Sequence, residues 1–249
     1  MSETEEKVEK KLKARYGRAL LKISGEVLGG GEGEGLDPAA LGRVAGELGR
    51  IVKGSDAELA VVVGGGNIMR GRDAKEIRCR VRADYMGMLG TVINALALQD
   101  ALAQVGVPAR VLTSIPMSPV AEPYRRDVAL RHLEEGNVVI FGAGTGHPFF
   151  STDTTAALRA AEIGAACLVK GTNVDAIYEA DPKEHRDAEK LSRLTYDEAL
   201  RRDVGIMDAA AFSLCRQSDI PILVVDIRKD GKIERAIVRG EGIGTIVER

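Results

Sequence analysis

Aromatic residues are scarce in this 249-residue sequence, which has no tryptophan, five tyrosines and four phenylalanines. A hydrophobic core in this chain must therefore be built mainly from aliphatic side chains. Material for such a core is abundant, because hydrophobic residues make up 45% of the sequence, a share too large for a disordered chain. The length fits one large domain or two closely joined lobes.

Cysteine is also rare, and charge of either sign is not in excess. The three cysteines, Cys79, Cys167 and Cys215, lie far apart and show neither C-x-x-C nor Cys/His spacing, which argues against a zinc site and a disulfide scaffold. A reducing cytoplasm is the simplest compartment for such a chain. The net charge of −2 leaves no global basic field, so we expect no nucleic-acid partner.

Long hydrophobic runs are absent as well. The longest apolar stretch, residues 86–98, is interrupted by Asn94 and is shorter than the roughly 20 residues that cross a bilayer. The first residues of the chain are charged, not apolar, which argues against a signal peptide. We therefore expect no membrane association.

The sequence divides into a charged start and one domain. Residues 1–15 contain four glutamates, four lysines and one arginine, with Val8 and Leu12 as almost the only large apolar side chains. We expect these residues to form a mobile or loosely helical extension. A single domain then covers residues 16–249.

Within that domain, apolar runs alternate with segments of helical spacing. Strands are expected at residues 19–24, 59–63, 110–113, 138–141, 167–170 and 222–225, and a short hairpin or sheet edge at 233–238 and 245–247. Helices are expected from Pro38 onward and at residues 84–105, 127–135, 153–163 and 208–217. This alternation predicts an α/β fold in three layers, with a mostly parallel sheet covered by helices on both faces. Ligands bind such sheets beyond the carboxyl ends of the strands.

Glycine is in excess, with 29 residues, and it gathers in loops that follow expected strands. The first loop carries Lys22, whose ammonium group can reach phosphate oxygens, although an ordinary surface lysine is an equal alternative. The second loop contains three consecutive glycines whose N–H groups can face an anion, with Arg70 beside them as a two-donor phosphate ligand. A simple tight turn is the alternative there.

The third loop, residues 142–153, joins a strand to a helix whose N-terminus is a natural phosphate site. Ser151, Thr152 or Asp153 can cap that helix. An acid among phosphates needs cations nearby, so Asp153 suggests a metal or a lysine partner, but an ordinary N-cap is the commoner role. The loop also has a dinucleotide-like look, with His147 in place of the last glycine, which leaves a nicotinamide-dependent enzyme as a weak second hypothesis.

Together these loops resemble one protein family. The segments that carry the resemblance are LKISGE (21–26), GGGNIMRG (64–71), ADYMGML (83–89), GTGHPFFSTDT (144–154) and VDAIYEADP (174–182). In this order they are similar to the bacterial UMP kinases, or uridylate kinases, of the amino acid kinase superfamily. The similarity runs from about Tyr16 to the C-terminus. The usual family pattern has Asn, Thr, Lys and Gly where this chain has His147, Ser151, Asn173 and Ala176.

The resemblance implies transfer of the γ-phosphoryl group of ATP to UMP, giving UDP and ADP in pyrimidine nucleotide biosynthesis. Its implied catalytic residues are Lys22, Arg70 and Asp153. The implied ATP ligands are Lys22, Ile23, Ser24, Gly25, Gly66, Arg70, Thr172, Tyr178 and Asp181. The implied UMP ligands are Gly65, Asp84, Thr145, Gly146, His147, Pro148, Phe149, Phe150, Ser151 and Thr152.

By the same resemblance, Mg²⁺ arrives through the nucleotide phosphates and not through a metal site of the protein. The family is typically a homohexamer under allosteric control by nucleotides. Two other functions stay open: a sister kinase that acts on an amino acid or carbamate, and a nucleotide sensor without catalysis. Phosphoryl transfer needs mainly positioning and positive charge around the equatorial oxygens, which Lys22, Arg70 and backbone N–H groups can supply.

Overall fold

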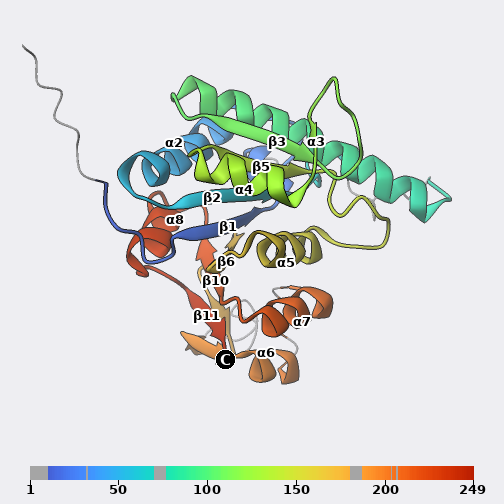
Figure 1. Ribbon diagram of the computed structural model, residues 1–249. Helices are drawn as coiled ribbons and strands as arrows, with labels where there is room; N and C mark the ends of the chain where they lie inside the picture. The colour runs from blue at the N-terminus through green and yellow to red at the C-terminus, as the bar shows by residue number, and fades with distance from the viewer. Residues whose placement is uncertain (1–10, 32, 70–76, 180–186, 203, 206) are drawn as a thin grey trace, which may run out of the picture.

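The computed structural model describes residues 11–31, 33–69, 77–179, 187–202, 204–205 and 207–249 (Figure 1). A nine-stranded sheet runs through the molecule in the order β4-β3-β5-β2-β1-β6-β10-β11-β9, and only the β10–β11 pairing is antiparallel. The strands are β1 (Arg18–Ile23), β2 (Glu58–Val63), β3 (Ala109–Thr113), β4 (Glu122–Pro123), β5 (Val138–Gly142), β6 (Cys167–Thr172), β9 (Arg193–Thr195), β10 (Ile222–Asp226) and β11 (Thr245–Glu248). A separate small hairpin pairs β7 (Ile177–Tyr178) with β8 (Lys190–Leu191).

Helices cover both faces of the large sheet (Figure 1). One face packs against α2 (Pro38–Gly54), α3 (Arg80–Gln104) and α8 (Lys232–Glu234), which continues as a wider helical turn over Arg235–Arg239. The other face packs against α4 (Arg126–Glu134), α5 (Thr152–Ile163), α6 (Tyr196–Arg201) and α7 (Ala209–Ser218). The short helix α1 (Gly25–Leu28) follows β1 directly. The prediction of a three-layer, mostly parallel α/β fold is confirmed.

Alternation along the buried strands decides which side chains face which helical layer. In β1, Leu21 and Ile23 belong to the core beneath α2 and α3, whereas Leu20 belongs to the core beneath α5. Because side chains alternate with a period of two, Lys22 points to the same side as Leu20, toward α5. In β6, Lys170 lies on the side of Leu168 by the same rule. Both lysines therefore emerge under one helix.

Local signals set the ends of the helices. Asp37 caps α2 by accepting hydrogen bonds from the N–H groups of Ala39 and Ala40, and Pro38 occupies its first turn. Ser151 caps α5 through the N–H of Thr154, and Gly164 ends the same helix with a φ of 65°. α3 begins at Arg80, four residues before the start that we expected.

The expected hairpin or edge at residues 233–238 is wrong in its first half. This segment is helical, and Ile233, Ala236 and Ile237 are all buried. Their i, i+3, i+4 spacing is that of a helix face, so the signal was present but too short to separate from a strand. The second half, residues 245–247, does form a strand within β11, but this strand lies between β10 and β9 and not at the edge of the sheet.

Part of the charged extension lies against the domain. The N–H of Leu12 donates to the carbonyl of Gly54, its carbonyl accepts from the N–H of Asp56, and the N–H of Ala14 donates to the Asp56 carboxylate at 2.7 Å. Residues 12–14 thus bind the loop between α2 and β2. Residues 1–10 lie outside the described part of the chain.

α3 is the one helix, among the described residues, that is long and apolar enough to cross a membrane by length and composition, with a mean hydropathy of 1.3 over its best 18-residue window. Half of that window is buried in the protein. Ala95 and Leu98 are fully buried in the core against the sheet, as in the core helix of a globular domain.

Candidate active site

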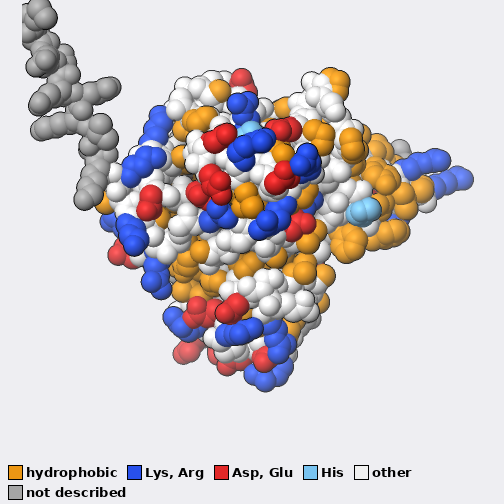
Figure 2. Space-filling model, in the orientation of Figure 1, with side chains coloured by type: hydrophobic (Ala, Val, Ile, Leu, Met, Phe, Trp, Pro, Cys, Tyr) orange, Lys and Arg blue, Asp and Glu red, His pale blue; other side chains and the backbone are white. Residues whose placement is uncertain are grey.

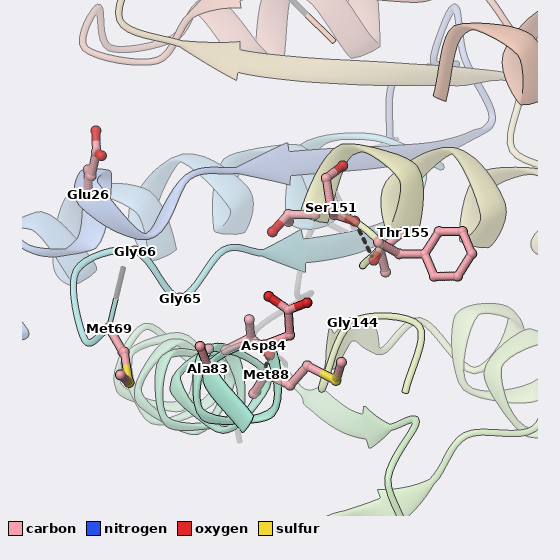
Figure 3. Close-up of a pocket in the computed structure, with 14 residues that line it drawn as sticks. Glu26, Gly65, Gly66, Met69, Ala83, Asp84, Met88, Gly144, Ser151 and Thr155 are labelled. Carbon is pink, nitrogen blue, oxygen red and sulfur yellow. Dashed lines mark hydrogen bonds between the residues drawn. The ribbon is translucent and has the colours of Figure 1, made fainter. Parts of the chain in front are cut away.

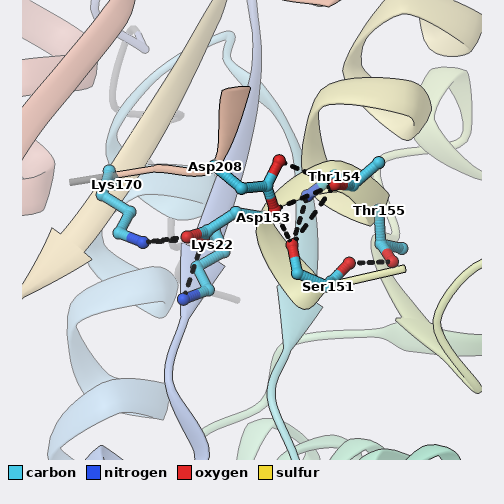
Figure 4. A network of polar contacts seen from close by, with 7 residues as sticks. All are labelled: Lys22, Ser151, Asp153, Thr154, Thr155, Lys170 and Asp208. Carbon is cyan, nitrogen blue, oxygen red and sulfur yellow. Dashed lines mark hydrogen bonds and ion pairs between the residues drawn. The ribbon is translucent and has the colours of Figure 1, made fainter. Parts of the chain in front are cut away.

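A cluster of two lysines and one aspartate lies at the carboxyl ends of β1 and β6 (Figure 4). Lys22 and Lys170 are direct register partners on these neighbouring parallel strands. Asp153, in the first turn of α5, is placed between them. Its Oδ1 lies 3.0 Å from the Lys22 Nζ, and its two oxygens accept hydrogen bonds of 2.7 and 2.5 Å from the Lys170 Nζ. Asp153 thus has the lysine partner that its position in the sequence suggested, and it has two.

Two ammonium groups and one carboxylate give this cluster a net charge of +1. The cluster is largely buried, because the two lysine side chains are each 11% exposed and the Asp153 side chain is 16% exposed. Burial and the nearby charge of Lys22 together lower the pKa of Lys170 to about 8, even though the charge and hydrogen bonds of Asp153 act to raise it. A site of this kind favours the arrival of an additional anion, which would stabilise both ammonium groups.

The N-terminus of α5 is fixed by a carboxylate from another helix. Asp208, the N-cap of α7, accepts hydrogen bonds from the hydroxyls of Ser151 and Thr154 (Figure 4). It also accepts from the N–H of Ala211. Burial alone would raise the pKa of Asp208, but the hydrogen bonds from Ser151, Ala211 and Thr154, together with the charge of Lys170, lower it overall. This link ties the first turn of α5, which carries Asp153, to the start of α7.

Two of the glycine loops approach each other more closely than any side chain would allow. A Cβ at Gly25 would lie 2.3 Å from the Asn67 Oδ1 and 2.8 Å from the Gly66 nitrogen. A Cβ at Gly65 would lie 2.5 Å from the carbonyl oxygen of Gly87 in α3. The loops after β1 and β2 are therefore packed together next to Lys22, and this close approach needs glycine at both positions.

A cavity of about 450 Å³ opens beside these loops (Figure 3). Figure 3 shows Asp84 pointing into it from α3, with Gly65 and Gly66 on one side and Ser151 and Thr155 of α5 across from them. The predicted ligands that line it are Gly65, Gly66, Asp84, Phe150, Ser151 and Thr152. The side chains of Glu26, Met69, Met88 and Thr91 also line it, and the sequence did not point to them.

The rest of the predicted acceptor loop lies at the mouth of this cavity. The N–H of Phe149 donates to the Asp84 Oδ2 at 2.8 Å, and Asp84 also accepts from the Arg80 Nε at 2.7 Å. Phe149 has a φ of 73° and is 69% exposed, an unusual state for an aromatic residue. The N–H of His147 donates to the Thr145 hydroxyl at 3.2 Å. Thr145, His147 and Phe149, together with Gly146 and Pro148, do not line the cavity itself.

The residues predicted to bind the adenine nucleoside lie farther along the sheet. Thr172 ends β6, and its hydroxyl closes a tight turn by donating to the carbonyl of Val174. Tyr178 donates to the Asp175 carboxylate at 2.7 Å, and this hydrogen bond raises the pKa of Tyr178. Ile23, Ser24 and Gly25 stand next to Lys22 at the end of β1. Arg70 and Asp181 lie outside the described residues.

Sequence reasoning missed Lys170, a member of the cluster, and Asp208, which holds the start of α5 beside it. A signal for Lys170 exists, because β6 is an apolar run that ends in Lys-Gly at residues 170–171, much as β1 ends in Lys22 close to Gly25. The pairing of the two strands, which the sequence does not reveal, is what makes the lysines neighbours. The sequence around Asp208 indicates only the N-cap of a helix and gives no sign of its contact with the start of α5.

Comparison with known proteins shows which family this chain resembles. The sequence model of the amino acid kinase family matches residues 17–226. A uridylate kinase from Oenococcus oeni is 51% identical over 237 residues, which cover 94% of this chain and 97% of that protein. The solved UMP kinase from Bacillus anthracis has a TM-score of 0.88 at 38% identity and covers 94% of this chain and 96% of its own.

An aspartate kinase from Synechocystis has a TM-score of 0.71 at 22% identity, covering 93% of this chain and 39% of its own, which shows a shared fold alone. With its parallel sheet and lysine pair, the chain belongs to the amino acid kinase family. Within that family it groups with the uridylate kinases, since its relative at 51% identity is one of them. These relatives do not favour the nicotinamide-dependent alternative.

Proposed function

We propose that this protein is a UMP kinase, which transfers the γ-phosphoryl group of ATP to UMP and forms UDP and ADP. The observation that carries the proposal is the Lys22–Asp153–Lys170 cluster, set beside a cavity that contains Asp84. The cluster supplies positive charge for a phosphoryl group, and the cavity supplies an acceptor for hydroxyl donors of a small ligand. High identity to a uridylate kinase supports the choice of substrate.

In the proposed reaction, an oxygen of the UMP phosphate attacks the γ-phosphorus of ATP, and the bond from that phosphorus to the β–γ bridging oxygen breaks. Negative charge is spread over the equatorial oxygens during transfer. The ammonium groups of Lys22 and Lys170 stabilise this charge in a site with little water. No general base is needed, because the acceptor phosphate is already an anion.

Asp153 acts on the lysines and not on the substrate. Both of its oxygens are engaged by ammonium groups, so it is poorly placed to take a proton. Its role is to keep the two cations within a few ångströms of each other before the phosphates arrive. The placement of charge in advance is the main protein contribution to this class of reaction.

We assign the predicted ligands to two sides of the cluster. The donor side comprises Lys22, Ile23, Ser24, Gly25, Gly66, Arg70, Thr172, Tyr178 and Asp181. The acceptor side comprises Gly65, Asp84, Thr145, Gly146, His147, Pro148, Phe149, Phe150, Ser151 and Thr152. The cavity next to Asp84 supports the acceptor side, and the order of β1, β6 and the turn at Thr172 supports the donor side.

Mg²⁺ enters this scheme as part of the ATP substrate. Among the described residues, no group of three His, Cys, Asp or Glu side chains is close enough to hold a metal ion. Mg²⁺ often binds through substrate phosphates with few protein ligands, which suits a site whose central carboxylate is already paired with lysines. We place the enzyme in pyrimidine nucleotide synthesis in the cytoplasm.

The proposal is tested by measuring ADP release with a panel of acceptors: UMP, CMP, dUMP, acetylglutamate and aspartate. We expect the highest kcat/KM with UMP. Preference for an amino acid would instead identify a sister kinase. ATP binding without turnover on any acceptor would identify a nucleotide sensor.

Replacing Asp84 with asparagine is expected to raise the KM for UMP about tenfold while the KM for ATP stays within about twofold. The substitution keeps the shape of the side chain but removes its charge and one acceptor oxygen from the cavity. The control is Arg80→Gln, which removes the other partner of the same ion pair on the exposed side. Arg80 is 66% exposed and does not line the cavity, so the control should raise the KM for UMP much less than Asp84→Asn and leave the KM for ATP unchanged.

We also propose that the protein is a homo-oligomer, a hexamer by its resemblance to the family. An apolar stripe on α3 supports self-association, because its side chains recur at helical spacing and stay exposed in the single chain. The residues are Val81 (37% exposed), Tyr85 (40%), Met86 (42%), Leu89 (49%) and Ile93 (44%). Figure 2 shows apolar side chains gathered on the side from which α3 projects. Exposed clusters of this kind often mark interfaces.

Light scattering tests this proposal. We expect Leu89→Glu to lower the molar mass of the assembly, because burying an unpaired carboxylate in an apolar contact is unfavourable. Val120→Glu is the control, since Val120 is equally apolar and exposed, at 51%, but lies outside α3. A wild-type monomer, or equal masses for the wild type and the Leu89→Glu variant, would reject the α3 interface.

A further inference from the structure

Arg159, in the middle of α5, is a buried cation that the proposed reaction does not use. Its side chain is only 5% exposed, although arginine is almost never fully buried unless it is paired. One guanidinium nitrogen, NH1, donates to the Glu162 carboxylate, and the other, NH2, donates to the Ser114 hydroxyl at 2.8 Å. The guanidinium carbon lies 3.6 Å from the centre of the Tyr124 ring, a stacking contact typical of arginine.

These contacts form one rigid unit between α5 and the sheet edge. The Tyr124 hydroxyl donates to the same Glu162 carboxylate at 2.5 Å, and the N–H of Tyr124 donates to the carbonyl of Thr113 at the end of β3. Burial and the bond to Glu162 raise the pKa of Tyr124, so its hydroxyl stays protonated as a donor. Arg159 is therefore held from three directions, by Glu162, by Tyr124 and by Ser114.

Ser114 carries the effect of Arg159 to the acceptor loop. While its oxygen accepts from Arg159, its hydroxyl donates to the carbonyl of Gly144 at 2.7 Å. Gly146, with a φ of 81°, lies so close that a Cβ there would be 3.2 Å from both the side chain and the carbonyl oxygen of Ser114. The loop is thus anchored on Ser114 just before its Thr145–Thr152 stretch reaches the cavity.

Stability alone gives a poor account of this arginine. Its Nε has no hydrogen-bond partner within the described part of the chain, and replacing a buried ion pair by apolar side chains is often neutral or stabilising. A donor that is both charged and rigid does one thing that an apolar residue cannot: it fixes the hydroxyl direction of Ser114. A hydroxyl that accepts from a cation is committed to donate elsewhere, here to Gly144.

We propose that Arg159 is a positioning residue that sets the acceptor loop through Ser114 and thereby the place of the acceptor nucleotide. The inference rests on the proposed function for the identity of the acceptor. Arg159 itself does not line the cavity, and its link to the loop runs through the Ser114 hydroxyl. Its influence should therefore fall on acceptor binding and leave the donor side unchanged.

The test is a double-mutant cycle with Arg159→Met and Ser114→Ala. We expect each single variant to raise the KM for UMP about tenfold, with the KM for ATP within about twofold. In the Ser114→Ala background, Arg159→Met should add less than about twofold, because both changes break one chain of bonds. Arg159→Lys should recover part of the loss, since an ammonium group can still donate to Ser114.

A matched control is Arg18→Met. Arg18 is also a partly buried arginine with a carboxylate and a carbonyl partner, Glu58 and Ile163, but it begins β1 at the end of the sheet opposite the site. Its loss should lower thermal stability and leave both KM values unchanged. Equal shifts in the two KM values for Arg159→Met, or additive effects in the cycle, would overturn the proposal.

Hydrogen exchange without substrates separates this inference from the proposed function. In Arg159→Met and Ser114→Ala, the amide of Gly146, which is bonded to the carbonyl of Ala143, should exchange about tenfold faster or more. The strand amides of β1 should not change. If UMP proved not to be the acceptor, this result would still be expected. An unchanged exchange rate at the Gly146 amide would reject the positioning role, whatever the substrate is. If Arg159→Met fails to fold, the Ser114→Ala variant still allows the test.

Discussion

Replacing Lys22 with alanine is expected to lower kcat about a hundredfold to a thousandfold, while the KM values for ATP and UMP change much less. Lys22 is 8% exposed and points toward α5 from the end of β1, where its ammonium group lies 3.0 Å from Asp153. Its charge is placed for the transferred phosphoryl group, whose negative charge is greatest during transfer. An interaction made mainly in the transition state affects kcat more than binding.

Steady-state kinetics with both substrates varied, together with nucleotide titration of the variant, checks this expectation. Lys53→Ala is the control. Lys53 lies in the last turn of α2, and its ammonium group donates to the carbonyl of Val105, just after α3. It should leave kcat unchanged. Undiminished turnover in the Lys22→Ala variant would remove Lys22 from the reaction.

Replacing Asp153 with asparagine is expected to have the second large effect. The substitution keeps the side-chain shape but leaves the two buried lysines facing each other without an anion. Leaving buried charges unpaired costs about 3–5 kcal/mol, so a lower melting temperature should accompany a loss of kcat of about a hundredfold. ATP should recover much of the lost stability, since its phosphates replace the missing negative charge.

The pH dependence of the same variant is more specific than its stability. In the wild type, Lys170 loses its proton as the pH rises through about 8, so the kcat/KM for ATP should fall on that alkaline side. The charge and hydrogen bonds of Asp153 raise the pKa of Lys170 against burial and Lys22. Without them the pKa drops, and the alkaline fall should move to lower pH. An alkaline limb at the same pH in the wild type and the Asp153→Asn variant would contradict the cluster as described.

Much of this fold could be predicted because its signals are local. The buried strands read as unbroken apolar runs, and the caps of α2 and α5 are written in Asp37-Pro38 and Ser151. The prediction of a hairpin or sheet edge at residues 233–238 is wrong because six residues of mixed spacing fit a strand and a helix equally well. Tertiary packing selects the helix, which buries Ile233 and Ile237 against the sheet.

The residues of the candidate site also fall into two groups, those that the sequence pattern indicated and those that only the folded structure brings together. Lys22, Asp84 and Asp153 stand in segments with a strong pattern of their own, and their ligand roles stay predictions. Lys170 was missed because its importance depends on the register of β6 against β1. Arg159 was missed because its partners, Ser114, Tyr124 and Glu162, come from two other loops and from its own helix. Contacts of this kind arise only when the chain folds.

The most direct test of the central claim follows the phosphoryl group itself. The protein is incubated with Mg²⁺, ATP labelled at the γ-phosphorus and equimolar UMP and aspartate, and the products are separated. We expect the label in the β-phosphate of UDP, with ADP formed in equal amount, and no such product from the Lys22→Ala variant. Label in an acyl phosphate of aspartate, or in inorganic phosphate alone, would contradict the account.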